Sequence, residues 1–339
     1  MKKLILALYL FTLPTLVLGD AVNLYRGETT VNGKEAAERR QAFPSALENV
    51  LVKISGVRDF TEYPAAQGAL RGAESLVLSY FYRNQDVPLA EGAVREELRL
   101  VVEFSPPGVD ELVRQIGLPV WPEERNPVET WVVLDQGMGR QILPQERQHD
   151  WEAMAEVARQ RGLPLRWPDA DEEGMYPVDA QLLWGGYTED LGASSRTGVM
   201  IVAARQEGLN WSVRSNLEYR GQVWAWRQQN EDLQAALLDV MQQAADNVAS
   251  TQAIAATDLG SWQHDMTITG ITGAEDYAAV LKELADFSMV DQVSVAAASP
   301  GRMTFRLRLN ALPRYFEEAL DGNRHLVLQE GEEQYAYKR

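Results

Sequence analysis

The 339-residue sequence contains no cysteine and only three histidines. Without cysteine there are no disulfides, thiolate metal ligands, cysteine nucleophiles or lipid-modified amino-terminal cysteines. His149, His264 and His325 lie far apart and match no metal-binding spacing. His149 and His264 each precede an aspartate, but neighbours on a strand point to opposite faces, so we expect no pairing. We predict no enzyme activity, no catalytic residue set and no cofactor.

Positive charge is also scarce. The chain has 32 Lys and Arg against 49 Asp and Glu, which gives a net charge of -17 at pH 7. This balance argues against a nucleic-acid partner, which needs a basic face, and against docking on anionic lipid. The 45% of hydrophobic residues and 24% of charged residues are typical of a folded protein.

The chain has one long uncharged apolar run, Leu4–Leu18, which follows two lysines and precedes small residues. This layout is typical of a secretory signal peptide, which we assign to residues 1–21 with cleavage after Gly19 or Ala21. The run of about 15 residues is short for a membrane span, although an uncleaved anchor remains the alternative. We therefore predict a periplasmic protein with no integral membrane span after cleavage.

Three units of the α+β class are expected along the mature chain: residues 22–120, 126–255 and 260–339. The first unit begins with a strand before the turn signal Asn32-Gly33. A helix follows, and a second helical stretch is expected from Ala65 to Tyr82. The apolar positions of the first helix recur with helical spacing at Phe43, Ala46, Leu47, Val50, Leu51 and Ile54.

The apolar patterns of the middle unit predict the order β-α-β-α-β-β-β-α, a small α/β sandwich. Its clearest elements are a helix ending at Gly162, an alternating strand from Trp211 to Tyr219 and a long final helix. The third unit reads as β-α-β-β-α.

Only weak metal-ligand candidates are present, so we predict no metal site. Asp169, Asp171 and Glu173 precede a glycine and copy the opening of a calcium-binding loop. The bidentate glutamate that such a loop requires is replaced by Ala180. A solvated acidic turn is the simpler interpretation.

Tryptophan is abundant, with nine residues. Trp211, Trp224 and Trp226 cluster in one expected hairpin and are our partner-binding candidates, because aromatic side chains often anchor interfaces. Since Trp211 shares its strand face with Val213 and Leu217, core packing is the alternative interpretation.

Several stretches resemble the uncharacterised proteobacterial family called domain of unknown function 2066. They are residues Arg39–Gly56, Gly117–Trp121 and Arg161–Pro164, the last followed by Asp169 and Asp171. Arg125-Asn126-Pro127 departs from the Arg-Pro pair expected there. The resemblance implies an exported protein and assigns no catalytic residues.

At the level of fold, the order of the middle unit is similar to that of the amino-terminal domain of the translocation protein TolB. It is also similar to that of the outer-membrane activators of penicillin-binding proteins. The first two units together are similar in layout to the flagellar assembly protein T. These relatives bind proteins of the envelope, although a shared fold does not define function.

We expect a non-enzymatic interaction or scaffold factor of the cell envelope with protein partners of unknown identity and an unknown oligomeric state. The alternatives are a binding module for an envelope ligand such as peptidoglycan and a metal-assisted hydrolase that uses the Asp169–Glu173 carboxylates.

Overall fold

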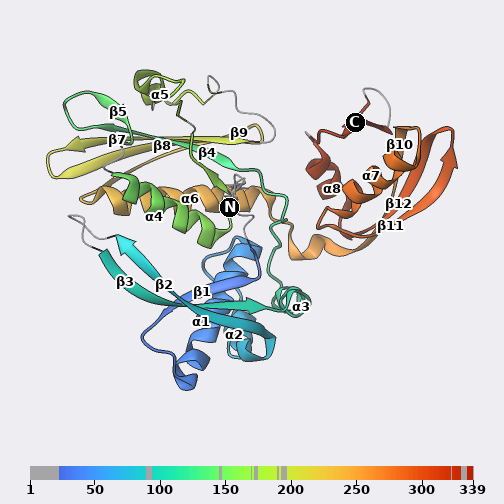
Figure 1. Ribbon diagram of the computed structural model, residues 1–339, viewed down its shortest axis with the longest axis horizontal. Coiled ribbons are helices and arrows are strands. Elements are labelled where there is room, and N and C mark those ends of the chain that lie inside the picture. The colour runs from blue at the N-terminus through green and yellow to red at the C-terminus, as the bar shows by residue number, and fades with distance from the viewer. Residues whose placement is uncertain are drawn as a thin grey trace, which may run out of the picture.

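A computed structural model describes residues 23–88, 94–144, 147–168, 170–171, 175–188, 191, 197–321, 323–329 and 334–338. Three β-sheets with packed helices make up this part of the chain (Figure 1). Helices and runs of one to three consecutive strands follow one another along the chain, and most strand pairs are antiparallel, so the predicted α+β class is confirmed. The predicted signal peptide, residues 1–21, lies outside the described residues. We call the parts that carry the three sheets the first, middle and third units.

The first unit comprises β1 (Arg26–Val31), α1 (Ala36–Ser55), α2 (Pro64–Leu70), β2 (Val77–Pro88), β3 (Val94–Phe104) and α3 (Pro106–Ile116). Its sheet has the order β1-β3-β2 with antiparallel pairs. Helix α1 packs on the sheet through the apolar stripe that its sequence predicts, and all six predicted positions of that stripe are buried.

The predicted helix from Ala65 to Tyr82 is wrong in its second half. Helix α2 ends at Leu70 and a strand begins at Val77. Gly72 weakens the helical conformation after α2. The valine and aromatic residues that follow pair with β3, where such side chains are favoured.

The middle unit comprises β4 (Val128–Asp135), β5 (Arg140–Ile142), α4 (Gln148–Arg161), β6 (Leu165–Arg166), α5 (Ala180–Gly185), β7 (Gly198–Glu207), β8 (Asn210–Tyr219), β9 (Gln222–Asn230) and α6 (Leu233–Gln252). Its sheet has the order β5-β4-β7-β8-β9, and β6 pairs with β4. Helices α4 and α6 pack on one face, and α5 packs on the other.

The observed order of the middle unit differs from the predicted one by the short strand β5. Strands β4 and β5 are antiparallel and are joined by a turn in which Gly137 and Gly139 have positive φ angles of 86° and 115°. A three-residue strand is too short to leave an alternating pattern in the sequence.

The third unit comprises β10 (Leu259–Ile271), α7 (Ala274–Ala285), β11 (Val290–Ser299), β12 (Gly301–Ala311), α8 (Pro313–Leu320), β13 (Leu326–Leu328) and β14 (Gln334–Tyr337). The sheet order is β11-β12-β10-β14-β13. The structure thus adds β13 and β14 to the predicted β-α-β-β-α order.

The first three strands of the first and third units have the same sheet topology. In each, the first strand pairs with the third, and the second strand lies at the edge, as β1-β3-β2 and β10-β12-β11. This is the split β-α-β arrangement. In the third sheet, β14 adds in parallel beside β10, whereas no strand of the described residues occupies the matching position beside β1.

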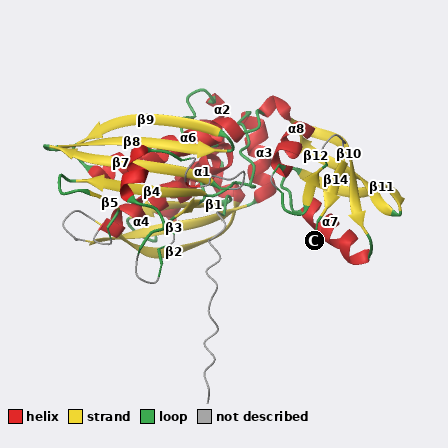
Figure 2. Ribbon diagram, turned by 90° about the horizontal axis from the view of Figure 1, so that it is seen from above, coloured by secondary structure: helices red, strands yellow, loops and turns green. Residues whose placement is uncertain are grey.

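Helices α4 and α6 lie between the middle sheet and the first unit, and the third unit is set to one side (Figures 1 and 2). The third unit meets the others through a small apolar seam formed by Ile254, Met289 and Ala311. A β-bridge between Val120 and Ile254 joins the two connecting segments at the same place.

Candidate functional site

The joint between the first and middle units is built from two helix ends. Helix α1 ends at Gly56 and helix α4 ends at Gly162, both with the left-handed conformation typical of C-terminal glycines. The guanidinium of Arg125 lies between these ends and donates to the carbonyl oxygens of Lys53 and Gly162 at 2.7 Å each. It therefore caps both helices at once, and its charge opposes the negative ends of their dipoles.

Burial shapes the chemistry of this joint. Arg125 also donates to the carbonyls of Pro122 and Trp121, and its guanidinium stacks 3.8 Å from the ring centre of Trp121. Burial lowers the pKa of Arg125, yet four carbonyl acceptors compensate for the lost water. Burial also lowers the pKa of Lys53 to about 8, and its ammonium donates to the carbonyls of Asn23 and Arg26.

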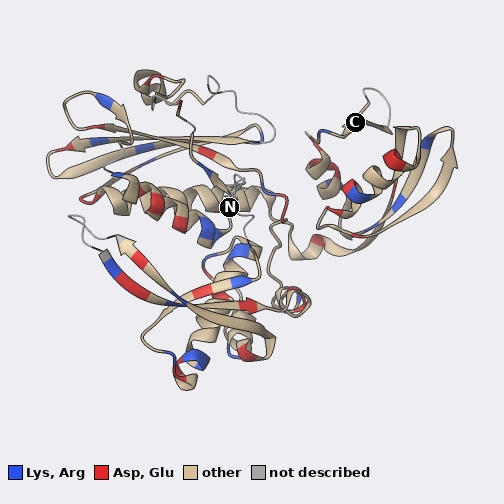
Figure 3. Ribbon diagram, in the orientation of Figure 1, with Lys and Arg blue, Asp and Glu red and all other residues tan. Residues whose placement is uncertain are grey.

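Ion pairs extend the same joint. Arg161 is 3% exposed and donates to the Gly56 carbonyl at 2.9 Å and to Asp246 of α6 at 2.6 Å. Arg159 of α4 pairs with Glu28 of β1 at 3.0 Å. Figure 3 shows acidic and basic residues side by side on the strands of the first sheet. The first and middle units are therefore held by directed polar contacts.

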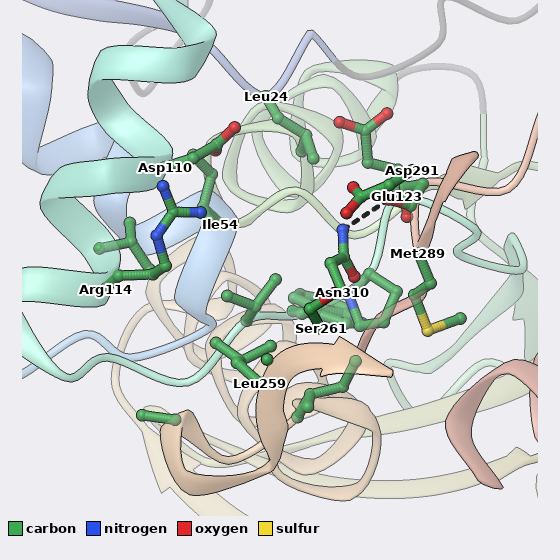
Figure 4. A pocket seen from close by; sticks show the side chains of 18 of the residues that line it. Leu24, Ile54, Asp110, Arg114, Glu123, Leu259, Ser261, Met289, Asp291 and Asn310 are labelled. Atoms are coloured by element: carbon green, nitrogen blue, oxygen red, sulfur yellow. Dashed lines mark hydrogen bonds between the residues drawn. The ribbon is translucent and has the colours of Figure 1, made fainter. Parts of the chain in front are cut away.

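A pocket of about 660 Å³ opens between the first unit, the third unit and the segments that connect them to the middle unit (Figure 4). The first unit contributes Leu24, Tyr25 and residues of α3, and the segment 120–123 contributes a second wall. The third wall comes from the start of β10 and from β11 and β12. A pocket of this volume suits a small organic molecule or one or two side chains.

The pocket has an apolar floor. Its apolar residues are Leu24, Ile54, Val113, Val120, Trp121, Ile254, Leu259 and Met289. Several of these are fully buried and belong to the cores of the first and middle units or to the apolar seam with the third unit. A ligand that enters the pocket would therefore bury apolar surface against groups that packing already holds in place.

Three carboxyl groups from separate segments line the same pocket. Asp110 of α3 is half-buried and accepts a hydrogen bond from the Tyr25 hydroxyl at 2.9 Å. Burial raises the pKa of Asp110, and burial together with the Asp110 charge raises the pKa of Tyr25. Glu123 and Asp291 lie at the exposed mouth.

The carboxyl of Glu123 has more negative than positive neighbours. Partial desolvation, followed by the charges of Glu124 and Asp110, raises the pKa of Glu123, and the charge of Arg125 opposes this shift. Glu124 itself accepts hydrogen bonds from the backbone amide and the hydroxyl of Ser288. This contact ties the segment between the first two units to the third unit and forms one edge of the junction.

The shape and lining of the pocket suit the binding of a ligand better than the catalysis of a reaction. The described residues that line it include no histidine, lysine or cysteine. The hydroxyl of Ser288 donates to the carboxylate of Glu124 at 2.8 Å, a contact that joins two segments of the chain. Within the described ranges, no group of three His, Asp or Glu residues is placed to hold a metal.

The acidic loop predicted as a weak metal candidate is only partly described. Asp171 is exposed, and its carboxylate accepts from the backbone amide of Met175 at 2.7 Å. Its own amide donates to the Met175 carbonyl at 2.9 Å. Asp169 and Glu173 lie outside the described residues. The described part of this loop is thus a local turn closed by Asp171.

The three tryptophans predicted as partner anchors pack against the core of the middle unit. Trp211 is 7% exposed, and Trp224 and Trp226 are partly buried beside it. They lie on the face of β8 and β9 that α4 and α6 cover. This packing matches the core alternative, and it leaves Trp211 without a free ring face for a partner.

The expectation that His149 and Asp150 do not meet is wrong. Both residues lie in the first turn of α4, and His149 Nε2 is 3.3 Å from Asp150 Oδ1. The argument assumed a strand, whereas neighbouring side chains at a helix start can reach one another. Asp150 is fully buried, and its other oxygen accepts from Arg147 at 2.5 Å.

Sequence reasoning missed the pocket residues and the capping arginine. Asp110 and Asp291 are far apart in the chain, and no spacing rule joins them. Arg125 lies in the stretch that departs from the Arg-Pro pair of domain of unknown function 2066, and that departure predicts no role for its side chain. Its position between two prolines and two predicted units was the one available signal.

Comparisons with known proteins add little on function. Residues 20–122 match the family described as "Domain of unknown function (DUF8605)". This match spans the first unit and less than half of the chain, and the resemblance to domain of unknown function 2066 stays a prediction. No curated protein matches.

A solved structure titled "Crystal structure of uncharacterized protein" is similar over 38% of this chain and 89% of its own. The identity is 12% and the TM-score is 0.16, so this likeness supports no inference. Among the described residues, no helix is long and apolar enough to cross a membrane.

Proposed function

We propose that this chain is a non-enzymatic binding protein of the cell envelope that receives part of a partner or ligand in the junction pocket. One observation carries the proposal: the first unit, the third unit and the segments that connect them to the middle unit supply the walls of a single pocket with an apolar floor. Pockets between units are frequent binding sites, because a ligand there contacts several rigid walls.

The way the units are joined supports this function. The first and middle units are fixed by the buried contacts of Arg125 and Arg161, whereas the third unit is held by a small apolar seam and by the contact of Ser288 with Glu124. A ligand in the pocket would touch both the fixed part and the third unit, and would add contact area where the chain itself has little.

The envelope location is part of the proposal and rests on the apolar amino-terminal run. Protein partners in the envelope agree with the fold-level similarities that the middle unit suggests. No described feature favours peptidoglycan stacking on the clustered tryptophans, since these are packed. The described part of the acidic loop, at Asp171, is a local turn with Met175.

Site-specific photo-crosslinking in living cells tests the function. The photo-reactive residue p-benzoylphenylalanine replaces Ser261 at the pocket, or Leu209, which is 89% exposed and lies at the remote β7–β8 turn. We expect a discrete adduct from position 261 and none of the same mass from position 209. Identical adducts at both positions, or no adduct at 261, would contradict the proposal.

A further inference from the structure

We propose that the junction pocket selects an organic cation, meaning an ammonium or guanidinium group carried on an apolar body. This inference rests on the proposed binding function and names the class of ligand. It follows from how charge, apolar surface and shape are combined in one cavity.

The carboxyl groups approach the cavity from different directions. Figure 4 shows Asp110 and Arg114 on one side and Glu123 with Asp291 on the other. The three acids come from α3, from the segment between the first two units and from β11. A ligand between them would meet negative charge on both sides of the apolar floor.

Cations of the protein offset the charge of these acids only in part. Arg114, the cation among the described lining residues, acts on Asp110 but donates to Glu111 on its own helix at 2.7 Å and 3.3 Å. Arg308 is 3.7 Å from Asp291, a loose contact between two exposed side chains. The charge of Arg125 acts on Glu123, but that guanidinium donates to four backbone carbonyls. With Glu111 and Glu124 close by, acids outnumber these three arginines, so the pocket carries excess negative charge.

The excess charge discriminates among ligands. The pocket would repel an anion. A neutral apolar ligand would displace the water that solvates the carboxylates and would provide no charge in its place. Only a cation both neutralises the mouth and lets its apolar body reach the floor. Aromatic recognition of the cation is not available at Trp121, because Arg125 already stacks on that ring.

The cation could be a free amine or a basic side chain of a partner segment, because both present the same group. Titration calorimetry on the purified protein tests the class with three probes that share one body: 4-phenylbutylamine, 4-phenylbutan-1-ol and 4-phenylbutyrate. We expect the amine to bind at least about tenfold more tightly than the alcohol, and the carboxylate not to bind. The amide of the tripeptide Phe-Lys-Phe is a second arm: tighter binding than the amine indicates a partner segment, and weaker binding indicates a free amine.

A matched pair of variants locates the effect. Glu123→Gln with Asp291→Asn should reduce the preference for amine over alcohol to about twofold or less. Glu48→Gln with Asp239→Asn makes the same change of net charge at exposed positions of α1 and α6, and should preserve the preference.

Two results would overturn the inference. If the alcohol binds as tightly as the amine, the pocket binds ligands but does not select cations. If the amine and the peptide both fail to bind at about 10 mM, the cation class is wrong whatever the crosslinking shows. In that case, a crosslinked adduct at position 261 would still support the proposed binding function. Without such an adduct, both the binding function and the cation inference would be rejected.

Discussion

At the scale of single residues, Arg125 contributes most to how the chain is held together. Its guanidinium satisfies carbonyls at the ends of α1 and α4, which lie in two different units. Arginine suits this role because its planar group offers five donors in fixed directions, which a lysine cannot match.

Replacement of Arg125 should therefore be costly. We expect Arg125→Met to lower the free energy of unfolding by about 3 kcal/mol, because buried carbonyls lose charged donors. Arg125→Lys should recover only part of this, since one ammonium cannot reach both helix ends. Urea denaturation measures the change, and Arg40→Met, at an exposed position of α1, serves as the control. Equal stabilities of Arg125→Met and Arg40→Met would contradict the capping role.

Lys53 should make stability depend on pH in the alkaline range. Its pKa is about 8 in the folded chain against a usual value of 10.5, so between these values the unfolded chain binds more protons. Unfolding free energy then rises with pH through this window, and the full cost of the buried charge applies below pH 8. The neutral amine can still donate to the carbonyls of Asn23 and Arg26.

The comparison of parent and Lys53→Met isolates this effect. The stability of the parent relative to the variant should increase by up to about 3 kcal/mol from pH 7 to pH 10.5, since one pKa unit corresponds to about 1.4 kcal/mol. Lys282→Met should not reproduce the rise, because Asp286 raises the pKa of Lys282. Parallel curves for parent and Lys53→Met would disprove the assignment.

At the scale of elements, two helix ends provide a matched test. Gly117 ends α3 and Gly162 ends α4, with φ angles of 79° and 72°. A Cβ at Gly117 meets nothing within 4 Å, whereas one at Gly162 lies 2.3 Å from Arg125 Nη1. We expect Gly117→Ala to lower stability by about 1 kcal/mol through backbone strain alone. Gly162→Ala should cost clearly more, as measured by thermal unfolding, and equal costs would show that Arg125 moves freely.

The helices and strands also show which parts of the fold the sequence could predict. The buried stripe of α1 was predictable because one apolar face recurs from Phe43 to Ile54, about three helical turns, and Gly162 ended α4 as expected. The strand that begins at Val77 was not predictable, because it shares one apolar stretch of sequence with the short helix before it. Strands β13 and β14 are three and four residues long, and they depend on pairing, of β14 with β10 and of β13 with β14, rather than on local pattern.

The pocket was beyond sequence reasoning for a different reason. Its acids come from the first unit (Asp110), the segment that follows that unit (Glu123) and the third unit (Asp291), and only the packing of these parts brings them together. The tryptophans were more visible in the sequence, yet burial and not abundance decides whether a tryptophan is available to a partner.

At the scale of the whole molecule, the seam at Met289 should control the position of the third unit. Met289→Glu places a charge beside Ile254 and Ala311, and this should release the third unit from the others. Protease cleavage in the connection formed by residues 253–258 should accelerate by about tenfold or more, because opening the seam exposes that backbone.

A control separates release of the third unit from its unfolding. Val295→Glu adds the same charge to the same unit at a side chain that is 42% exposed, and it should leave the cleavage rate unchanged. If Met289→Glu is cleaved no faster than Val295→Glu, the seam does not hold the third unit in place.

The capping of α1 from outside its own unit has a consequence for biosynthesis. The groups that complete the end of α1 are Arg125 and Arg161, and Arg161 in turn pairs with Asp246. A ribosome or an export channel delivers the chain from its amino terminus, so the first sheet emerges long before these partners do. The first unit should therefore reach its final stability only after residue 246 has arrived, and the first two units should mature as one block.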